Sequence, residues 1–225
     1  MFVFFVFFSE NSTFIHSEIG YDFEDTENYL NESSVIPGVW NQSARFVSGV
    51  DSINMTSVID QDSCFFDISK CVHGFSVRFA FRFVQELDVD QVIMSTGGNN
   101  PDGLGFALTY TAMNESLPFR RYFRIDVRTA TAEYKTWFNV QYDVWSDVII
   151  SWHVKFGIRV FVDDILAVCE YSTQETRITA PTILHQNLTI GHDTLDNKVL
   201  GTFDMDALTI LDVAVFEEDL LNGGL

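Results

Sequence analysis

Asparagine and aspartate side chains gather in two stretches of the sequence that could bind a hard cation. Asn99, Asn100 and Asp102 lie in GGNNPDG, and Asp193 and Asp196 lie in GHDTLD. Such cations take oxygen ligands that loops supply as carboxylates and carbonyls, so calcium is the one cofactor that these residues indicate. The alternative is structural: the first loop is a turn whose Asn and Asp side chains cap their own backbone, and the second is a polar connection.

Acid–base and nucleophilic catalysis find no support in the sequence. Glycoside hydrolases present two carboxylates across the scissile bond, and the Glu-x-Asp-x-x-Glu spacing that places them on one strand is absent. The acidic runs FEDTEN and FEEDLL do not alternate like a strand and indicate solvated surface. A Gly-x-Ser-x-Gly elbow is also absent. The five histidines are scattered and form no His-x-x-x-His pair: His16, His73, His153, His185 and His192. We therefore expect that the protein is not an enzyme.

The three cysteines predict one short disulfide. Cys64 and Cys71 are the natural pair, because the DISK segment between them contains turn-forming residues that bring its ends together. Zinc is disfavoured, since this spacing is not Cys-x2-Cys and no His pair completes four ligands. Cys169 is left free or paired outside the chain.

Several signals favour the secretory route. The run FVFFVFF near the start has the composition of a signal-peptide core, but no basic residue precedes it, so such a signal peptide would be atypical. The alternatives are an ordinary buried strand and a start codon misplaced within a longer gene. No stretch approaches the roughly 18 apolar residues of a membrane span, so we expect no membrane insertion. We expect an extracellular location and glycans at the Asn-x-Ser/Thr positions Asn11, Asn31, Asn41, Asn54, Asn114 and Asn187.

Composition indicates one globular domain with a thick aromatic core. The 225 residues include 22 Phe, 7 Tyr and 4 Trp, and strands accept aromatic residues readily. A net charge of -19 repels a phosphate backbone, so nucleic acid is an unfavourable partner.

Period-two alternation predicts an all-β protein. In FSVRFAFRF, residues 75–83, phenylalanine and valine occupy one face while Ser76, Arg78, Ala80 and Arg82 occupy the other. No apolar pattern keeps the helical period for more than about two turns, so we expect an antiparallel two-sheet sandwich. Further strands are predicted at 91–96, 104–110, 122–127, 136–140, 146–154, 158–163, 165–171, 183–191 and 207–216.

Four segments in order resemble a known family. These are GYDFED with GVWNQSARFVSG, then DISKCVHGFSVRFAFRF, then WSDVIISWHVKFGIRVFVDD, and finally LTIGHD with FDMDALTILDVAVFEEDL. Together they resemble a laminin-G-like, pentraxin-like jelly roll of the concanavalin A-like lectin/glucanase superfamily. The resemblance implies a jelly-roll domain over residues 20–220, with a lead-in at 1–19 and a tail at 221–225. In such domains the small cysteine loop anchors the long inner strand.

The resemblance also implies a function. Laminin-G-like domains are mostly non-enzymatic recognition or adhesion modules that bind protein or glycan partners through sandwich loops, and relatives often hold calcium at a loop rim. The alternatives are a carbohydrate-active enzyme on the same fold and a passive spacer in a larger receptor. Two departures stand out: Asp164 replaces the usual glycine of a Val-Asp-Gly turn, which leaves the turn type open, and the second cysteine pairing of true pentraxins is not recognisable.

Overall fold

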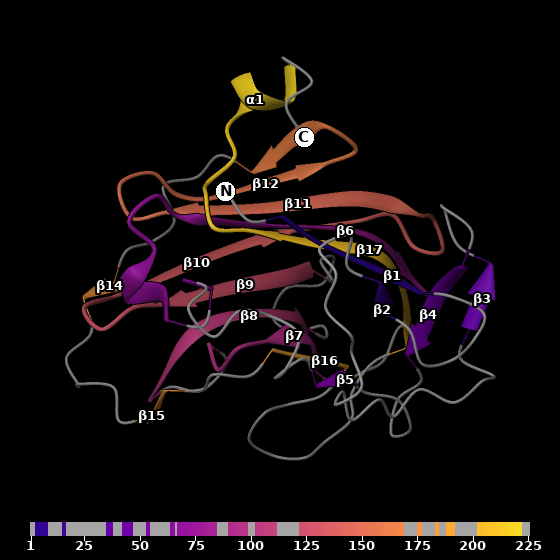
Figure 1. Cartoon of the computed structure of the whole chain (residues 1–225), viewed down its shortest axis with the longest axis horizontal. Coiled ribbons are helices and arrows are strands. Elements are labelled where there is room, and N and C mark those ends of the chain that lie inside the picture. The colour runs from indigo at the N-terminus through magenta and orange to yellow at the C-terminus, as the bar shows by residue number, and fades with distance from the viewer. Residues whose placement is uncertain are drawn as a thin grey trace, which may run out of the picture.

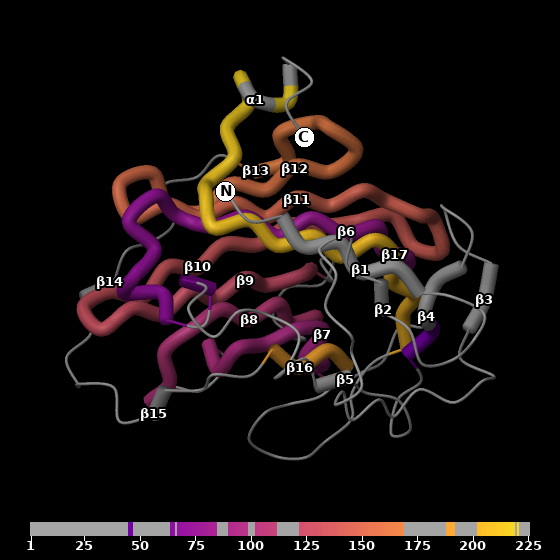
Figure 2. Tube along the Cα trace, viewed as in Figure 1, coloured from indigo at the N-terminus to yellow at the C-terminus, as the bar shows by residue number. Residues whose placement is uncertain are grey.

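In a computed structural model of the chain, the residues that the structure describes with their side chains are those coloured in Figure 2, whose tube follows the Cα trace. The described residues are 45–46, 64–65, 67–84, 90–98, 102–111, 122–168, 188–191, 202–218 and 220. For the strand residues 3–8, 15–16, 35–37, 42–44, 53–54, 175–176 and 183–184, and for 219 and 221, only the backbone is described.

Two antiparallel sheets pack face to face as a jelly-roll sandwich, as the sequence predicts (Figure 1). Among the described residues, nine strands form one sheet, with the order β13-β12-β11-β6-β17-β1-β2 and with β4 and β3 beyond β17. Its strands are β1 (Val3–Phe8), β2 (Ile15–His16), β3 (Val35–Pro37), β4 (Gln42–Phe46), β6 (Phe75–Phe83), β11 (Ser146–His153), β12 (Gly157–Val162), β13 (Ile165–Val168) and β17 (Phe203–Leu211).

Eight described strands form the second sheet, in the order β14-β10-β9-β8-β7-β16-β5, with β15 parallel to β8. A single 3-10 turn, η2 (Ile68–Lys70), and a short helix, α1 (Glu217–Leu221), complete the described elements, and α1 stands off the sandwich in Figure 1. None of the described helices is long and apolar enough to cross a membrane. The strands of this second sheet are β5 (Ile53–Asn54), β7 (Gln91–Ser95), β8 (Gly103–Thr111), β9 (Tyr122–Arg128), β10 (Ala132–Phe138), β14 (Glu175–Thr176), β15 (Ile183–Leu184) and β16 (Thr189–Ile190).

The aromatic core lies between the sheets and centres on β6. Its predicted inward side chains are all buried, and the rings of Phe81 and Phe123 from opposite sheets meet edge to face at 5.4 Å. Such edge-to-face pairs add about 0.5–1.5 kcal/mol to the burial of the rings. The alternation in FSVRFAFRF is therefore confirmed, with Phe75, Val77, Phe79, Phe81 and Phe83 in the core.

The last long strand was predicted in the wrong place, at 207–216 instead of 203–211. A β-bulge explains the error: the register against β6 shifts between Asp206 and Thr209, and Ala207 has a φ of 50°. An extra residue changes which side of the strand faces inward. Phe203 and Ile210 therefore both lie in the core although their numbers differ by an odd step.

Three other predicted strands also differ from the structure. The strand expected at 136–140 is β10, which begins at Ala132, because Thr129 and Ala132 close a turn just before it through a backbone bond of 2.9 Å. The strand expected at 183–191 is two short strands, β15 and β16. Of the strand expected at 165–171, the described part ends at Val168.

The apolar run near the start forms β1, which pairs antiparallel with Leu208–Leu211 of β17. Removal of residues 1–19 as a leader would take away both β1 and β2, and it would leave that part of β17 without this neighbour.

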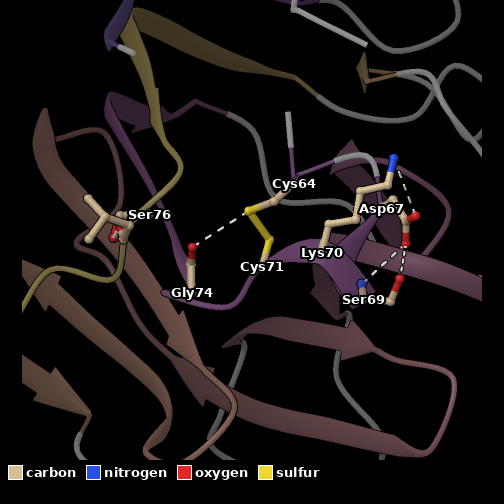
Figure 3. The surroundings of a disulfide bond; sticks show 8 residues. Cys64, Asp67, Ser69, Lys70, Cys71, Gly74 and Ser76 are labelled. Atoms are coloured by element: carbon tan, nitrogen blue, oxygen red, sulfur yellow. Dashed lines mark hydrogen bonds and ion pairs between the residues drawn. A yellow bond between two sulfur atoms is a disulfide. The ribbon is translucent and has the colours of Figure 1, made fainter. Parts of the chain in front are cut away.

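The predicted disulfide between Cys64 and Cys71 is present (Figure 3). The loop that it closes contains η2, whose N-terminus is capped by Asp67, which accepts a bond from the Ser69 backbone N–H at 3.2 Å. The Cys64 sulfur also lies 3.6 Å from the carbonyl oxygen of Gly74, directly before β6. The Gly74 backbone N–H donates to the Cys71 carbonyl at 3.1 Å, so the loop is bonded to the entry of the long inner strand.

Ion pairs cover the outer face of the nine-stranded sheet. The Asp204 carboxylate is fully buried and accepts bonds from Arg45 at 2.7 Å and from Arg82 at 2.8 Å. Arg78 makes a similar pair with Asp147 on β11. Because a buried carboxylate needs compensating charge, these pairs explain how acidic residues lie within the sheet.

Candidate functional site

The outward side chains of β8, β9 and β10 form a charged surface that we call the polar face. Strand register places Asp126 opposite Ala107 and Lys135, Arg128 opposite Glu133, and Arg124 opposite Trp137. These side chains share one side of the sheet because residues directly opposite in a ladder point the same way. The polar face consists of Thr109, Thr111, Tyr122, Arg124, Asp126, Arg128, Glu133, Lys135 and Trp137.

Charge pairs organise the centre of the polar face. Arg124 donates to Asp126 at 2.7 Å, and Glu133 accepts from Arg128 at 2.5 Å and lies 3.1 Å from the Lys135 ammonium. Burial raises the pKa of the Asp126 carboxyl, and the attraction of Arg124, Arg128 and Lys135 offsets only part of that effect. Burial also raises the pKa of Glu133, but hydrogen bonds from Lys135 and Arg128 outweigh it, so this pKa lies below its ordinary value.

Several buried polar atoms of the polar face have unused hydrogen-bonding capacity. Among the described residues, no partner bonds to Thr109 Oγ1, Thr111 Oγ1, Asp126 Oδ1 or Arg128 Nη1. Each such atom typically costs about 1–3 kcal/mol if it stays unsatisfied, and native proteins contain few of them. Their concentration on two neighbouring strands marks this surface as one that an added polar group could satisfy.

An exposed aromatic pair lies at the rim of the polar face. Trp137 has 42% of its surface exposed, and its ring meets that of Tyr122 edge to face at 6.4 Å. Trp137 is also the direct cross-strand neighbour of Arg124. The surface thus combines an apolar platform with hydrogen-bonding side chains that are already held in place.

Two carboxylates lie on the polar face, but their environment does not suit acid–base catalysis. Asp126 and Glu133 come from neighbouring strands, so the single-strand spacing examined in the sequence could not find them. Asp126 is fully buried, and both carboxylates are held by cations. A glycosidase needs one carboxyl group free to protonate the leaving oxygen, which this arrangement does not offer.

The predicted calcium ligands remain largely outside the described residues. Asp102 is described, and it is exposed just before β8, whereas Asn99, Asn100, Asp193 and Asp196 lie outside. Within the part of the chain that the structure describes, no three His, Cys, Asp or Glu residues gather as a metal site. Calcium therefore stays a hypothesis.

Of the predicted turn GGNNPDG, residues 97, 98, 102 and 103 are described, and residues 99–101 lie outside the described part of the chain. The segment connects β7 to β8, and the backbone N–H of Gly98 donates to the carbonyl of Phe106 at 3.2 Å. A side chain at position 98 would overlap the Phe106 backbone, which explains the glycine.

The remaining predicted site residues give a mixed picture. Of the glycosylation acceptors, Asn54 lies on β5, where only its backbone is described. The other acceptors lie outside the described residues: Asn11, Asn31, Asn41, Asn114 and Asn187. Cys169 also lies outside them. Two of the histidines, predicted to be scattered, lie near each other: burial lowers the pKa of His153 most, and the charges of Lys155, Arg159 and His73 lower it further.

The polar face itself was not predicted from the sequence. The segment YFRIDV was predicted as a strand, and its alternation of Tyr122, Arg124 and Asp126 was the available signal. The partner residues on β10 could not be assigned, because that strand was expected four residues later than it begins.

Comparison with known proteins supports the fold and nothing finer. No protein-family model matches the sequence, and no curated protein matches it. Solved structures do match: one titled "Cell entry of botulinum neurotoxin type C is dependent upon interaction with two ganglioside molecules" is 10% identical with a TM-score of 0.62 over 99% of this chain and 51% of that one.

Two other matches have the same character. The binding domain of Paraclostridial Mosquitocidal Protein 1 is 12% identical, with a TM-score of 0.62 over 96% of this chain and 50% of that chain. The binding domain of botulinum neurotoxin DC, in complex with rat synaptotagmin II, is 11% identical, with a TM-score of 0.61 over 99% and 51%. The chain spans about half the length of these proteins. The similarity indicates a jelly-roll sandwich and does not single out a laminin-G-like or pentraxin-like branch.

Proposed function

We propose that this chain is a non-enzymatic extracellular recognition module that binds a glycan through the polar face. The observation that carries the proposal is the exposed ring of Trp137 beside a sheet surface with four unpartnered buried polar atoms, as counted among the described residues. Sugar rings offer hydroxyl groups that both donate and accept, together with C–H faces that pack on aromatic rings.

Access to the unpartnered atoms requires a side-chain movement. Asp126 is fully buried, whereas its neighbours Arg124 and Lys135 carry long side chains that are 31% and 28% exposed. Long charged side chains change rotamer easily at a surface. In the proposed complex they swing aside, and sugar hydroxyls bond to Asp126 Oδ1 and Thr109 Oγ1.

Similarity to toxin binding domains supports a binding role only in outline. Gangliosides are named as partners of one botulinum neurotoxin, and synaptotagmin II of another. Those proteins are about twice as long as the matched region, so the matched half need not be the half that binds these partners. The proposal therefore rests on the polar face of this chain.

The extracellular assignment rests on the glycosylation pattern and the disulfide. Six Asn-x-Ser/Thr acceptors and the bond between Cys64 and Cys71 suit an oxidising secretory compartment. The proposed domain covers 20–220, and 1–19 is a lead-in whose strands β1 and β2 add to its sheet where they are retained. Sequencing the N-terminus of the secreted protein tests whether 1–19 is a leader, since cleavage would remove β1 and β2.

A glycan array with a matched pair of variants tests the proposal. Trp137 and Phe156 are equally exposed, at 42% and 43%, but Phe156 lies on the hairpin between β11 and β12. Trp137→Ala should abolish the array signal or weaken it at least tenfold, as loss of a central aromatic contact does. Phe156→Ala should leave the signal unchanged.

A second variant separates binding from folding. Thr109→Val replaces an unpartnered buried hydroxyl by a methyl group of the same shape, so thermal stability should be retained or should rise. Glycan affinity should fall, because the hydroxyl that the ligand satisfies is gone. Absence of any glycan signal from the natural chain, or equal binding by all three variants, would contradict a glycan site on the polar face.

A further inference from the structure

Arg159 differs from every other arginine that the structure describes. Arg45, Arg78, Arg82, Arg124 and Arg128 each pair with a carboxylate. The Arg159 guanidinium instead lies 5.2 Å from the centre of the Phe156 ring and 4.7 Å from that of Phe216, and no ion pair to it occurs within the described part of the chain. In a chain of net charge -19, an arginine without a carboxylate partner among the described residues is unexpected.

Arg159 belongs to a compact group that we call the basic-aromatic cluster, which consists of His73, His153, Lys155, Phe156, Arg159 and Phe216. The ring of His153 lies 5.0 Å from that of Phe156 and 6.5 Å from that of Phe216, and the two phenylalanine rings meet edge to face at 5.5 Å. The cluster therefore joins the β11–β12 hairpin to the segment before α1.

Hydrogen bonds hold these pieces together. The backbone N–H of Phe156 donates to the carbonyl of His153 at 3.1 Å, which closes the hairpin turn. The backbone N–H of Val215, directly before Phe216, donates to the hydroxyls of Ser76 and Ser151, each at 2.9 Å. The Ala214 N–H donates to the carbonyl of His73 at 2.8 Å. The cluster is thus fixed to β6, to β11 and to the segment directly before β6.

Apolar side chains beside the cluster are unusually exposed. Val72 is 72% exposed, Val154 49% and Phe156 43%. Lys155 is exposed between the last two and forms no ion pair among the described residues. Burial lowers the pKa of His153, and Lys155, Arg159 and His73 lower it further, so its ring is a neutral, flat contact surface at neutral pH.

The chemistry of this surface matches an anion attached to an apolar body. A guanidinium held against aromatic faces keeps its edge available for a bidentate carboxylate. Exposed valine and phenylalanine side chains surround this guanidinium. The same combination of apolar residues, aromatic rings and arginine is typical of the centre of protein interfaces, where aromatic residues and arginine carry most of the binding energy. The cluster contributes no amide or carboxylate side chain for sugar hydroxyls, unlike the polar face.

We propose that the basic-aromatic cluster is a second binding site, and that it takes an acidic and apolar peptide segment of a protein partner. A partner carboxylate bonds to Arg159 and Lys155, and apolar partner side chains cover Phe156, Val154 and Val72. The proposal is independent of glycan binding, since it uses a different surface and different chemistry.

Fluorescence anisotropy with two synthetic peptides tests the proposal on the full chain. One short peptide alternates Glu and Asp with Leu and Phe, and the other carries Lys at each acidic position. The natural chain should bind only the acidic peptide. Arg159→Ala should weaken binding at least about tenfold, and Arg159→Lys should restore only part of it because lysine lacks the planar fork.

Two controls distinguish binding at the cluster from a general effect of charge or of unfolding. Lys70→Ala removes an exposed cation outside the cluster, one that lies 3.7 Å from Asp67, and should not alter peptide binding. Thermal unfolding of every variant, together with the glycan-array signal, shows that the sandwich and the polar face remain intact.

Other outcomes would overturn the proposal. Equal binding of both peptides would show that the apolar residues attract them whatever their charge. A loss with Lys70→Ala as large as that with Arg159→Ala would show that overall charge, and not the cluster, attracts the acidic peptide. Saturation of Arg159 by sialic acid instead of the peptide would make the surface a glycan site. Concentration-dependent dimerisation of the natural chain that Arg159→Ala abolishes would identify a second copy as the occupant.

Discussion

Asp163 and Asp147 bond to each other twice. The backbone N–H of Asp163 donates to the Asp147 carbonyl at 2.8 Å, and the backbone N–H of Asp147 donates to the Asp163 carboxylate at 2.9 Å. The two-residue turn between β12 and β13 is thereby tied to the start of β11. Asp163 and Asp164 have φ angles of 52° and 62°, as a type I′ hairpin turn requires, which settles the turn type that the sequence left open.

Asp164→Gly should stabilise the protein by about 0.5–1 kcal/mol, because glycine adopts positive φ without steric cost and Asp-Gly is a preferred type I′ pair. Asp163→Gly is the matched comparison, since it also relieves the backbone but removes the carboxylate that accepts from Asp147. It should destabilise by about 1 kcal/mol. Urea unfolding midpoints measure both, and equal effects of the two substitutions would contradict the explanation.

Replacing Cys64 and Cys71 together by serine should lower the unfolding free energy by about 2–3 kcal/mol, as expected for a short closed loop. Cys169→Ser is the control and should leave stability unchanged. Peptide mapping without reductant should recover one fragment that joins Cys64 to Cys71. A fragment that joins Cys169 to either of them would show that the pairing is different.

Asp126→Asn should make the protein more stable than the natural chain at neutral pH. The folded-state pKa of Asp126 is raised by burial, so its ionised form destabilises the fold. The sign follows from this: below the pKa of the unfolded chain the cost vanishes, and it grows as pH rises through the folded pKa. Thermal unfolding from pH 3 to 7 should show an advantage that grows with pH, and a shrinking advantage would refute the burial argument.

Glycans should occupy Asn41, Asn54, Asn114 and Asn187 in protein secreted from eukaryotic cells, and glycosidase treatment should lower the mass. Asn54 lies on β5, at one end of the described strand order, directly opposite Thr189. Because a glycan there blocks pairing with another sheet, Asn54→Gln should aggregate at lower concentration than Asn114→Gln. An unchanged mass would exclude the modification.

Calcium binding at the predicted loops can be measured by thermal unfolding in millimolar calcium and in chelator. A ligand bound only by the folded chain raises stability by RT ln(1 + [L]/Kd), so occupied loops should raise the midpoint by several degrees. Asp102→Asn and Asp193→Asn, tested separately, should each remove the shift if their loop supplies ligands. Identical midpoints in both buffers would leave a metal-free sandwich.

Local sequence determined much of this protein. Strict alternation in residues 75–83 defines the core strand, the spacing of Cys64 and Cys71 defines the disulfide, and glycine-rich GGNNPDG defines the connection between β7 and β8. Each of these features depends on contacts within a few residues, or on a simple inside and outside division, so the sequence carries them directly.

Tertiary structure decided what the sequence could not. Because of the bulge at Ala207, the last strand differs from its predicted position, since one extra residue reverses the pattern of inward side chains. Strand register placed Lys135 opposite Asp126 and Trp137 opposite Arg124. The course of the chain after β17 placed the Phe216 ring against the Arg159 guanidinium. Both candidate surfaces arise between residues from different strands, and only the paired sheets determine which of those residues meet.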